Sequence, residues 1–233
     1  MSDSEHKYFN FPIILLEGFL NDSNTCLINI IDYSLYKFSV KTECYIDKES
    51  FRNSADYFKV TLSHCEDSYE NGKALYDSID ERTPKASIEV KLWTDFYKNH
   101  KTDFEKVCLL AFIALRSIIG RKPYCKTTNN YLLARMDGKS KTVKSDDELS
   151  AQILRYSTRR KLDNIKKELQ LNWHLRYLSN YNRGFYISFT LKLEILAEIA
   201  ESKRPINLEA AQKQKVKRAR DEAKRKIEDK IGN

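Results

Sequence analysis

The sequence predicts a mainly α protein that carries one β-hairpin towards its C-terminal end. Apolar residues recur at helical spacing through most of the 233 residues, and capping residues precede several of these segments. Beyond Gln170 the period of the apolar residues changes from 3.6 to 2. We therefore expect a helical N-terminal module over residues 1–100, a domain with a C-terminal hairpin over 101–200, and a basic C-terminal helix over 201–233.

Three helices are expected in residues 1–100. The first covers Asn24–Phe38, the second begins near Asp47, and the third begins at Thr83-Pro84, where a capping residue precedes a proline. The apolar face of the third helix is expected to consist of Ile88, Leu92 and Phe96. Phe9–Leu16 is apolar and contains a proline, which indicates an extended packing segment. No catalytic or phosphate-binding motif stands in this half, which predicts a scaffold or a partner-binding module.

Capping residues define four helices between residues 102 and 170. Thr102 and Glu105 have the spacing of a capping box, and Gly120 ends the helix that they start. A short helix follows Thr127/Thr128 and stops at Gly138. A polar, basic loop then leads to a second capping box, Ser145–Glu148, which opens a helix through Leu154. The fourth helix is Arg159–Gln170, and the residues that it turns inward are Leu162, Ile165 and Leu169.

The predicted hairpin follows this fourth helix. In its first strand, large side chains alternate with polar ones, namely Trp173, Leu175 and Tyr177 with His174 and Arg176. In its second strand the alternation is that of Phe185, Ile187 and Phe189 with Tyr186 and Ser188. The segment between them, Asn180–Gly184, is rich in residues that tolerate positive φ.

Charge is distributed unevenly along the chain. Residues 1–100 hold 11 Lys and Arg against 17 Asp and Glu, whereas residues 101–233 hold 30 against 16. The second half therefore has a strong positive balance, which favours a polyanion as its partner. A solvated basic surface is the simpler alternative.

Several classes of protein do not fit the sequence. No apolar run is long enough to span a membrane, and the first residues do not resemble an export signal, so we expect a cytoplasmic protein. The five cysteines form no C-x-x-C pair, which predicts reduced thiols and no metal site. No set of Asp, Glu, His or Cys residues converges in a catalytic pattern. We therefore expect neither a cofactor nor an enzymatic activity.

The order of helix, helix, basic helix and hairpin resembles the winged helix-turn-helix superfamily over residues 102–190. The stretch 149–190 is most similar to regulators and replication initiators of phages and plasmids. The residues that carry this resemblance are Ala151, Ser157-Thr158 at the turn, the basic helix after them, and Asn182-Arg183-Gly184. Two segments remain candidates for the helix before the recognition helix, Asn129–Met136 and Asp147–Tyr156, and we prefer the second because its spacing to Ser157 is ordinary. Either choice makes Arg159–Gln170 the recognition helix.

The resemblance implies that this helix enters the major groove of DNA. Arg159 and Arg160 would then read guanine, Asn164 would read adenine, and Thr158 would contact a phosphate or a thymine methyl. Lys166 and Lys167 would bind phosphates, and Arg183 would reach the minor groove from the hairpin tip. The expected contact surface also includes Lys161 and Arg176.

The expected function is non-catalytic binding of double-stranded DNA, as a transcription regulator or replication initiator of a phage or mobile element. The alternative is a winged helix that binds protein, as a scaffold or assembly subunit. A helix from Asn207 to about Lys230 remains open to three roles, which are contact with phosphates, pairing with a second copy in a homodimer, and a solvated tail. The N-terminal half is expected to bind a protein partner.

Overall fold

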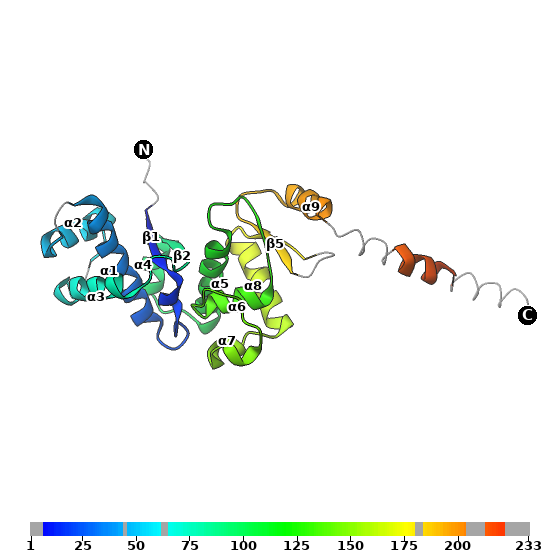
Figure 1. Cartoon of the computed structure of the whole chain (residues 1–233), viewed down its shortest axis with the longest axis horizontal. Helices are drawn as coiled ribbons and strands as arrows, with labels where there is room; N and C mark the ends of the chain where they lie inside the picture. Colours follow the sequence, from blue (N-terminus) through cyan, green and yellow to red (C-terminus); the bar gives the residue numbers. More distant parts are fainter. Residues whose placement is uncertain (1–6, 44–45, 62–64, 180–183, 204–212, 222–233) are drawn as a thin grey trace, which may run out of the picture.

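The computed structural model describes residues 7–43, 46–61, 65–179, 184–203 and 213–221, and these residues are mainly helical with two small antiparallel sheets. The mainly α class predicted from the sequence is therefore confirmed. The helices of residues 1–100 gather on one side of the molecule, and those that follow residue 102 gather on the other (Figure 1).

The first sheet joins the beginning and the end of the N-terminal half. Strand β1 (Tyr8–Pro12) pairs antiparallel with β2 (Lys85–Glu89), and Phe9 lies opposite Ile88. Both side chains are fully buried. The extended segment that the sequence predicts is confirmed as far as Pro12, after which Ile13–Leu16 forms a 3-10 turn.

The prediction that a helix begins at Thr83-Pro84 is wrong about where the helix starts. Residues 85–89 are strand β2, and helix α4 (Val90–Lys98) begins only after them. The Ile13 N–H donates a hydrogen bond of 2.9 Å to the Pro84 carbonyl, which holds this segment in the sheet. The spacing of Ile88 to Leu92 and Phe96 fits a helix, although its alternation with polar, half-buried neighbours also fits a strand.

Three helices complete the N-terminal half: α1 (Ser23–Thr42), α2 (Lys48–Phe58) and α3 (Cys65–Ser78). Local caps start the first two. Asp22 accepts a hydrogen bond of 3.0 Å from the Thr25 N–H, and Asp47 forms a capping box with Ser50. Helices α1 and α2 were predicted, whereas α3, which packs along α1, was not.

Helix α5 (Asp103–Ile119) connects the two halves. It starts with the predicted capping box, in which the Thr102 N–H donates to the Glu105 carboxylate at 2.9 Å and the Glu105 N–H donates to the Thr102 hydroxyl at 3.2 Å. Gly120 follows its last turn, as predicted. One continuous cluster of buried hydrophobic side chains runs through both halves of the molecule and includes Phe9, Leu109 and Ile187.

The second half combines helices with a three-stranded sheet. Its helices and strands are, in chain order, β3 (Cys125–Thr127), α6 (Asn129–Met136), α7 (Ala151–Leu154), α8 (Arg159–Asn172), β4 (Arg176–Leu178) and β5 (Phe185–Ser188). The strands pair antiparallel in the order β3-β5-β4, so β5 is central and Ile187 lies between Cys125 and Tyr177. The antiparallel pair β4 and β5 confirms the predicted strand pairing, but β4 starts at Arg176 and not at Trp173, because Trp173 is the C-cap of α8 and His174 has a φ of +57°. Strand β3 is a third strand that was not predicted.

The helix expected over 147–156 is wrong in its extent. Ser145 and Glu148 form the predicted capping box, but it opens only a 3-10 turn, Asp146–Glu148. The chain is extended at Leu149 and Ser150, and α7 then makes a single turn. The cause is tertiary, because Leu149 is buried and the Ser150 N–H donates a hydrogen bond of 2.9 Å to the Asp137 carboxylate.

Helix α9 (Leu193–Ser202) follows the sheet and was not predicted. Its Leu196 and Ala200 pack against Tyr186 in a small separate cluster. This contact explains why all four residues of β5 are buried, although the alternation of its residues predicts one exposed face. No helix in the described ranges combines the length and the apolar character that crossing a membrane requires.

Residues 213–221 are helical, and every one of them is exposed. They form the middle of the helix predicted from Asn207 to Lys230, whose two ends lie outside the described residues.

Candidate nucleic-acid interface

Helix α8 is fixed to the body of the protein by one apolar face. Leu162, Ile165 and Leu169 are buried, as predicted, and the helix packs against α5 and β4. The helix continues two residues beyond its predicted end, to Asn172. One face of α8 is therefore anchored, and the residues opposite it are available to solvent.

The exposed side of α8 carries most of the predicted contact residues. Exposed side chains are those of Thr158, Arg159, Arg160, Lys161, Asn164 and Lys167. Arg160, Asn164 and Lys167 are four and three residues apart, a spacing that places them in one row along the helix. None of these three side chains has a hydrogen bond or ion pair with another described residue. They form a row of donors that is open to a ligand.

The other exposed cations of α8 have weak or local partners. Arg159 lies 3.7 Å from the carboxylate of Asp163, and both side chains are more than half exposed, at 92% and 51%. Such an exposed pair contributes only a few tenths of a kcal/mol, roughly, to stability. The Lys161 ammonium donates to the backbone carbonyl of Arg155. Neither contact uses up the hydrogen-bonding capacity of the side chain.

The first turn of α8 is electrostatically unusual for this protein. It contains Arg159, Arg160 and Lys161 and no acidic residue, and Thr158 stands at the N-cap without a side-chain cap. Side chains cap α1, α2, α5 and α6, whereas α4, α7 and α9 also lack a side-chain cap, so the feature that distinguishes α8 is its three adjacent cations. Cations at a helix N-terminus add to the positive end of the helix dipole instead of compensating it, so this turn is unfavourable until an anion binds there.

Lys166 does not lie on the exposed face, and its predicted outward orientation is wrong. It is 4% exposed, and its ammonium donates a hydrogen bond of 2.8 Å to the Asn129 side-chain carbonyl at the start of α6. It also lies 4.3 Å from the centre of the Phe185 ring. Burial lowers the pKa of the ammonium, and the Asp163 carboxylate, 3.7 Å away, opposes this effect. Lys166 therefore joins α8 to α6 and to the hairpin.

The tip end of the hairpin, where Gly184 directly precedes β5, lies against the start of α6. Gly184 has a φ of +97°, and a Cβ atom there would lie 2.2 Å from the Thr127 carbonyl oxygen. Only glycine fits at this point. Arg183 and most of the predicted tip lie outside the described residues. Arg176 lies at the start of β4, towards the other end of the sheet from the tip, and is partly buried.

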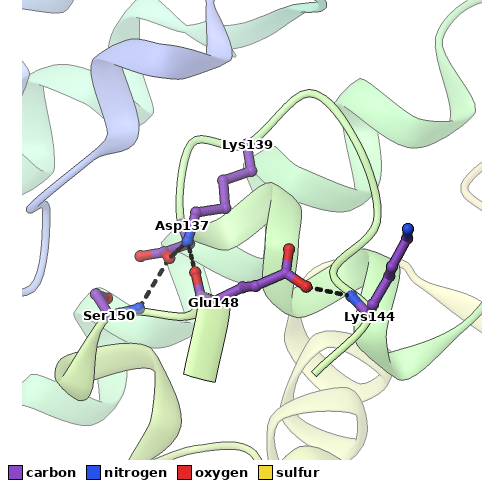
Figure 2. Close-up of polar contacts among 5 residues, drawn as sticks. All are labelled: Asp137, Lys139, Lys144, Glu148 and Ser150. Atoms are coloured by element: carbon purple, nitrogen blue, oxygen red, sulfur yellow. Dashed lines mark hydrogen bonds and ion pairs between the residues drawn. The ribbon is translucent and has the colours of Figure 1, made fainter. Parts of the chain in front are cut away.

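A buried carboxylate holds the loop between α6 and α7 in place (Figure 2). Asp137, which is 6% exposed, accepts hydrogen bonds from the Ser150 N–H at 2.9 Å and from the Lys139 ammonium at 2.7 Å. Lys139 also donates to the Glu148 backbone carbonyl, and the Glu148 carboxylate accepts from the Lys144 N–H at 2.9 Å. These contacts leave Lys141 and Lys144 exposed on a loop whose ends are fixed.

Two observations concern metal ligands and thiols among the described residues. Among them, no three His, Cys, Asp or Glu side chains lie together as metal ligands. Burial raises the pKa of the Cys26 thiol to about 11 and that of Cys108 to about 12. Both thiols therefore stay protonated near neutral pH and are poor nucleophiles.

The chain matches no protein-family model, no curated protein and no solved structure.

Proposed function

We propose that this protein binds double-stranded DNA through α8, in the manner of a winged helix-turn-helix domain. The order of elements supports the proposal, because α5, β3, α6, α8, β4 and β5 come in the order of that fold, with a 3-10 turn and α7 inserted between α6 and α8. In this arrangement α8 is the recognition helix and the β4–β5 hairpin is the wing. The function is non-catalytic, and the DNA backbone is the anion that the basic half of the chain requires.

Within this proposal α6 is the helix that precedes the recognition helix. This assignment replaces the preference for residues 147–156, because α6 has eight residues and contacts α8 through Asn129, whereas α7 has one turn. Residues 137–158 then form an insertion between the two helices of the motif. The Asp137 contacts keep that insertion folded against the end of α6.

The observation that carries the proposal is the first turn of α8. Three adjacent cations in a first turn that has no side-chain cap and no acidic residue destabilise a free helix end, and phosphates would convert the same turn into a favourable site. In this proposal Arg160 and Asn164, one turn apart on α8, would reach base edges, and Lys167 would bind a phosphate. Thr158, Arg159 and Lys161 add contacts at the N-terminal end.

We further propose that binding at a specific DNA site positions the acidic N-terminal half, or a protein bound to it. This role corresponds to transcription regulation or replication initiation in a phage or mobile element. The sequence resemblance and the Asn-, Lys- and Tyr-rich composition, which is typical of AT-rich genomes, support it. The competing function is a protein-binding winged helix that contacts an acidic partner with the same basic surface.

Fluorescence anisotropy with a labelled random duplex at about 50 and 200 mM salt tests the proposal. With six or more phosphate contacts, affinity should fall by roughly a thousandfold between the two salt concentrations. Arg160→Ala/Lys167→Ala should weaken binding at least tenfold. It should also reduce the slope of log affinity against log salt concentration by roughly one to two, because one or two phosphate contacts are lost. The matched control, Lys48→Ala/Lys91→Ala, removes two exposed lysines of the N-terminal half and should bind like the unmodified protein.

Two results would contradict DNA binding through α8. The first is no binding by the unmodified chain at the lower salt concentration, which would favour the protein-binding function. The second is equal affinity for the α8 variant and its control, which would place the contact elsewhere on the basic half.

A further inference from the structure

A second basic surface lies away from the first turn of α8. Two adjoining hollows, of about 300 and 380 Å³, flank Phe189 and Thr190 at the end of β5. We call them together the Phe189 cleft. The turn between α5 and β3 lines one hollow, and the starts of β4 and α9 line the other. The cleft lies at the end of the sheet opposite the hairpin tip, because Arg176 pairs with Ser188 there.

Cations from three separate segments line the Phe189 cleft. The first hollow is lined by Arg116, Arg121 and Lys122 and by no acidic residue. The second is lined by two cations, Arg176 and Lys192, and by His174, with Glu194 as its one acidic residue. Within the described ranges, Arg121, Lys122 and Lys192 have no side-chain hydrogen bond or ion pair. The Arg116 guanidinium lies 5.4 Å from the centre of the Phe189 ring.

A buried hydroxyl fixes the two sides of the cleft to each other. Ser188 is fully buried, and its hydroxyl donates to the Pro123 carbonyl at 2.7 Å. The same oxygen accepts from the N–H groups of Thr190 and Leu191 at 3.1 and 2.9 Å. The turn that carries Arg121 and Lys122 is therefore linked to the segment that leads to Lys192. The cleft is formed before any ligand arrives, which lowers the entropic cost of binding.

Unpaired cations that share a concave surface repel one another. A cleft also focuses their field and raises the local concentration of anions. The repulsion has no structural purpose here, because these side chains, unlike Lys166, satisfy no buried acceptor. An extended anion with repeated charges would neutralise both hollows at once, whereas a single small anion would occupy one of them.

We propose that the Phe189 cleft binds the phosphate backbone of a nucleic acid, as a contact separate from the first turn of α8. Helix α8 has 14 residues and ends just before His174. The cleft is thus about 20 Å along the helix from Arg159, at 1.5 Å per residue. That separation permits two sources of phosphate, a distant part of the duplex on α8 or a second duplex. The proposal does not depend on α8 binding DNA.

The test uses the full chain with Arg121→Glu/Lys122→Glu, which changes two exposed side chains. Lys48→Glu/Lys91→Glu is the matched control, because it changes net charge equally on exposed residues of the N-terminal half. Two assays are run at about 50 mM salt. One measures anisotropy with a labelled duplex of about 20 base pairs, and the other measures capture of a labelled duplex by protein bound to an immobilised duplex. Thermal unfolding of both variants verifies that they are folded.

The two sources of phosphate give different expected results. If the cleft contacts the same duplex as α8, the cleft variant should lose at least tenfold in affinity relative to its control. If the cleft binds a second duplex, affinity for one duplex should stay within about twofold while capture of the second is lost. Equal behaviour of the cleft variant and its control in both assays overturns the proposal.

A milder variant and the α8 variant complete the design. Arg121→Ala/Lys122→Ala should show the same losses to a smaller degree, and it replaces the charge reversal if that variant unfolds. A loss caused by the cleft variant but not by Arg160→Ala/Lys167→Ala would support the cleft and contradict the proposed role of α8. A loss caused by Arg160→Ala/Lys167→Ala, together with a cleft variant that behaves like its control in both assays, would support α8 and overturn the cleft.

Discussion

Lys166 donates a 2.8 Å hydrogen bond from the middle of α8 to the Asn129 side-chain carbonyl at the first turn of α6. The bond joins the proposed recognition helix to the helix before it. The ammonium nitrogen also lies 4.3 Å from the centre of the Phe185 ring in the hairpin. One buried side chain therefore touches all three parts of the proposed DNA-binding unit.

Replacing Lys166 by methionine should change stability little. Methionine fills a similar volume and removes the cost of burying a charge, which offsets the loss of the bond to the partly exposed Asn129. We expect Lys166→Met to stay within about 1 kcal/mol of the unmodified protein in urea unfolding, and Lys166→Ala to lose about 2–4 kcal/mol because it leaves a cavity. A loss above about 3 kcal/mol for the methionine variant would show that the ammonium itself stabilises the fold.

A cap at the first turn of α8 should stabilise the protein and weaken duplex binding. In Thr158→Asp, the new carboxylate can accept from free N–H groups and compensates Arg159 and Arg160. We expect a gain of about 0.5–1.5 kcal/mol in urea unfolding and at least a fivefold loss of duplex affinity in anisotropy.

The control for this prediction removes a cap elsewhere. Thr102→Ala abolishes the capping box of α5 and should cost about 1 kcal/mol while leaving duplex affinity unchanged. If Thr158→Asp stabilises the protein and binds the duplex as before, the first turn of α8 does not face phosphates.

Asp32 should make stability decrease as pH rises. Asp32 belongs to α1, and its side chain is 1% exposed where α1 packs against α3. One of its carboxylate oxygens has no hydrogen-bond partner among the described residues. Burial raises the pKa of this carboxyl from 3.8 to about 6, although Asn71 donates to it at 2.8 Å. The folded state therefore holds the proton more tightly than the unfolded chain. Its stabilisation is complete below about pH 4 and is lost as pH rises through 6.

Asp32→Asn removes this ionisation. Relative to the unmodified protein, the variant should gain stability between pH 4 and 7, by up to roughly 3 kcal/mol, from the size of the pKa shift. Urea unfolding at several pH values measures the difference. Asp56→Asn, on the exposed side of α2, makes the same chemical change and should show no such gain. A difference that stays constant with pH would mean that Asp32 is already ionised at pH 4.

Local sequence features predicted the elements whose causes are local. The capping box of Thr102 and Glu105 and the caps of α1 and α2 lie within four residues of the helices that they start. The apolar spacing of Leu162, Ile165 and Leu169 fixed the orientation of α8 in the same way. Lys166 could also have been placed correctly, because it stands four residues after Leu162 and three before Leu169, but its charge suggested an exposed position.

Elements that depend on distant partners were not predicted. Strand β3 exists because it pairs with β5, more than 50 residues later, and β2 exists because it pairs with β1. Helix α3 contains Gly72, which weakens the helical pattern, yet a Cβ atom there would lie 2.5 Å from the Asp32 carbonyl of α1. The glycine permits the close approach of the two helices, which no single segment of sequence reveals. The Phe189 cleft is likewise assembled from three distant segments.

Two glycines with positive φ should differ sharply in their tolerance of alanine. A Cβ atom at Gly184 would overlap the Thr127 carbonyl oxygen, whereas at Gly120, with a φ of +57°, it would meet nothing within 4 Å. Gly120→Ala should therefore cost only the backbone strain, about 1–2 kcal/mol, and Gly184→Ala at least about 3 kcal/mol in urea unfolding. Amide hydrogen exchange should become faster in β3 and β5 of the Gly184 variant alone, because the added methyl group separates these strands. Equal costs for the two variants would contradict the close packing of Gly184, at the tip end of the hairpin, against the start of α6.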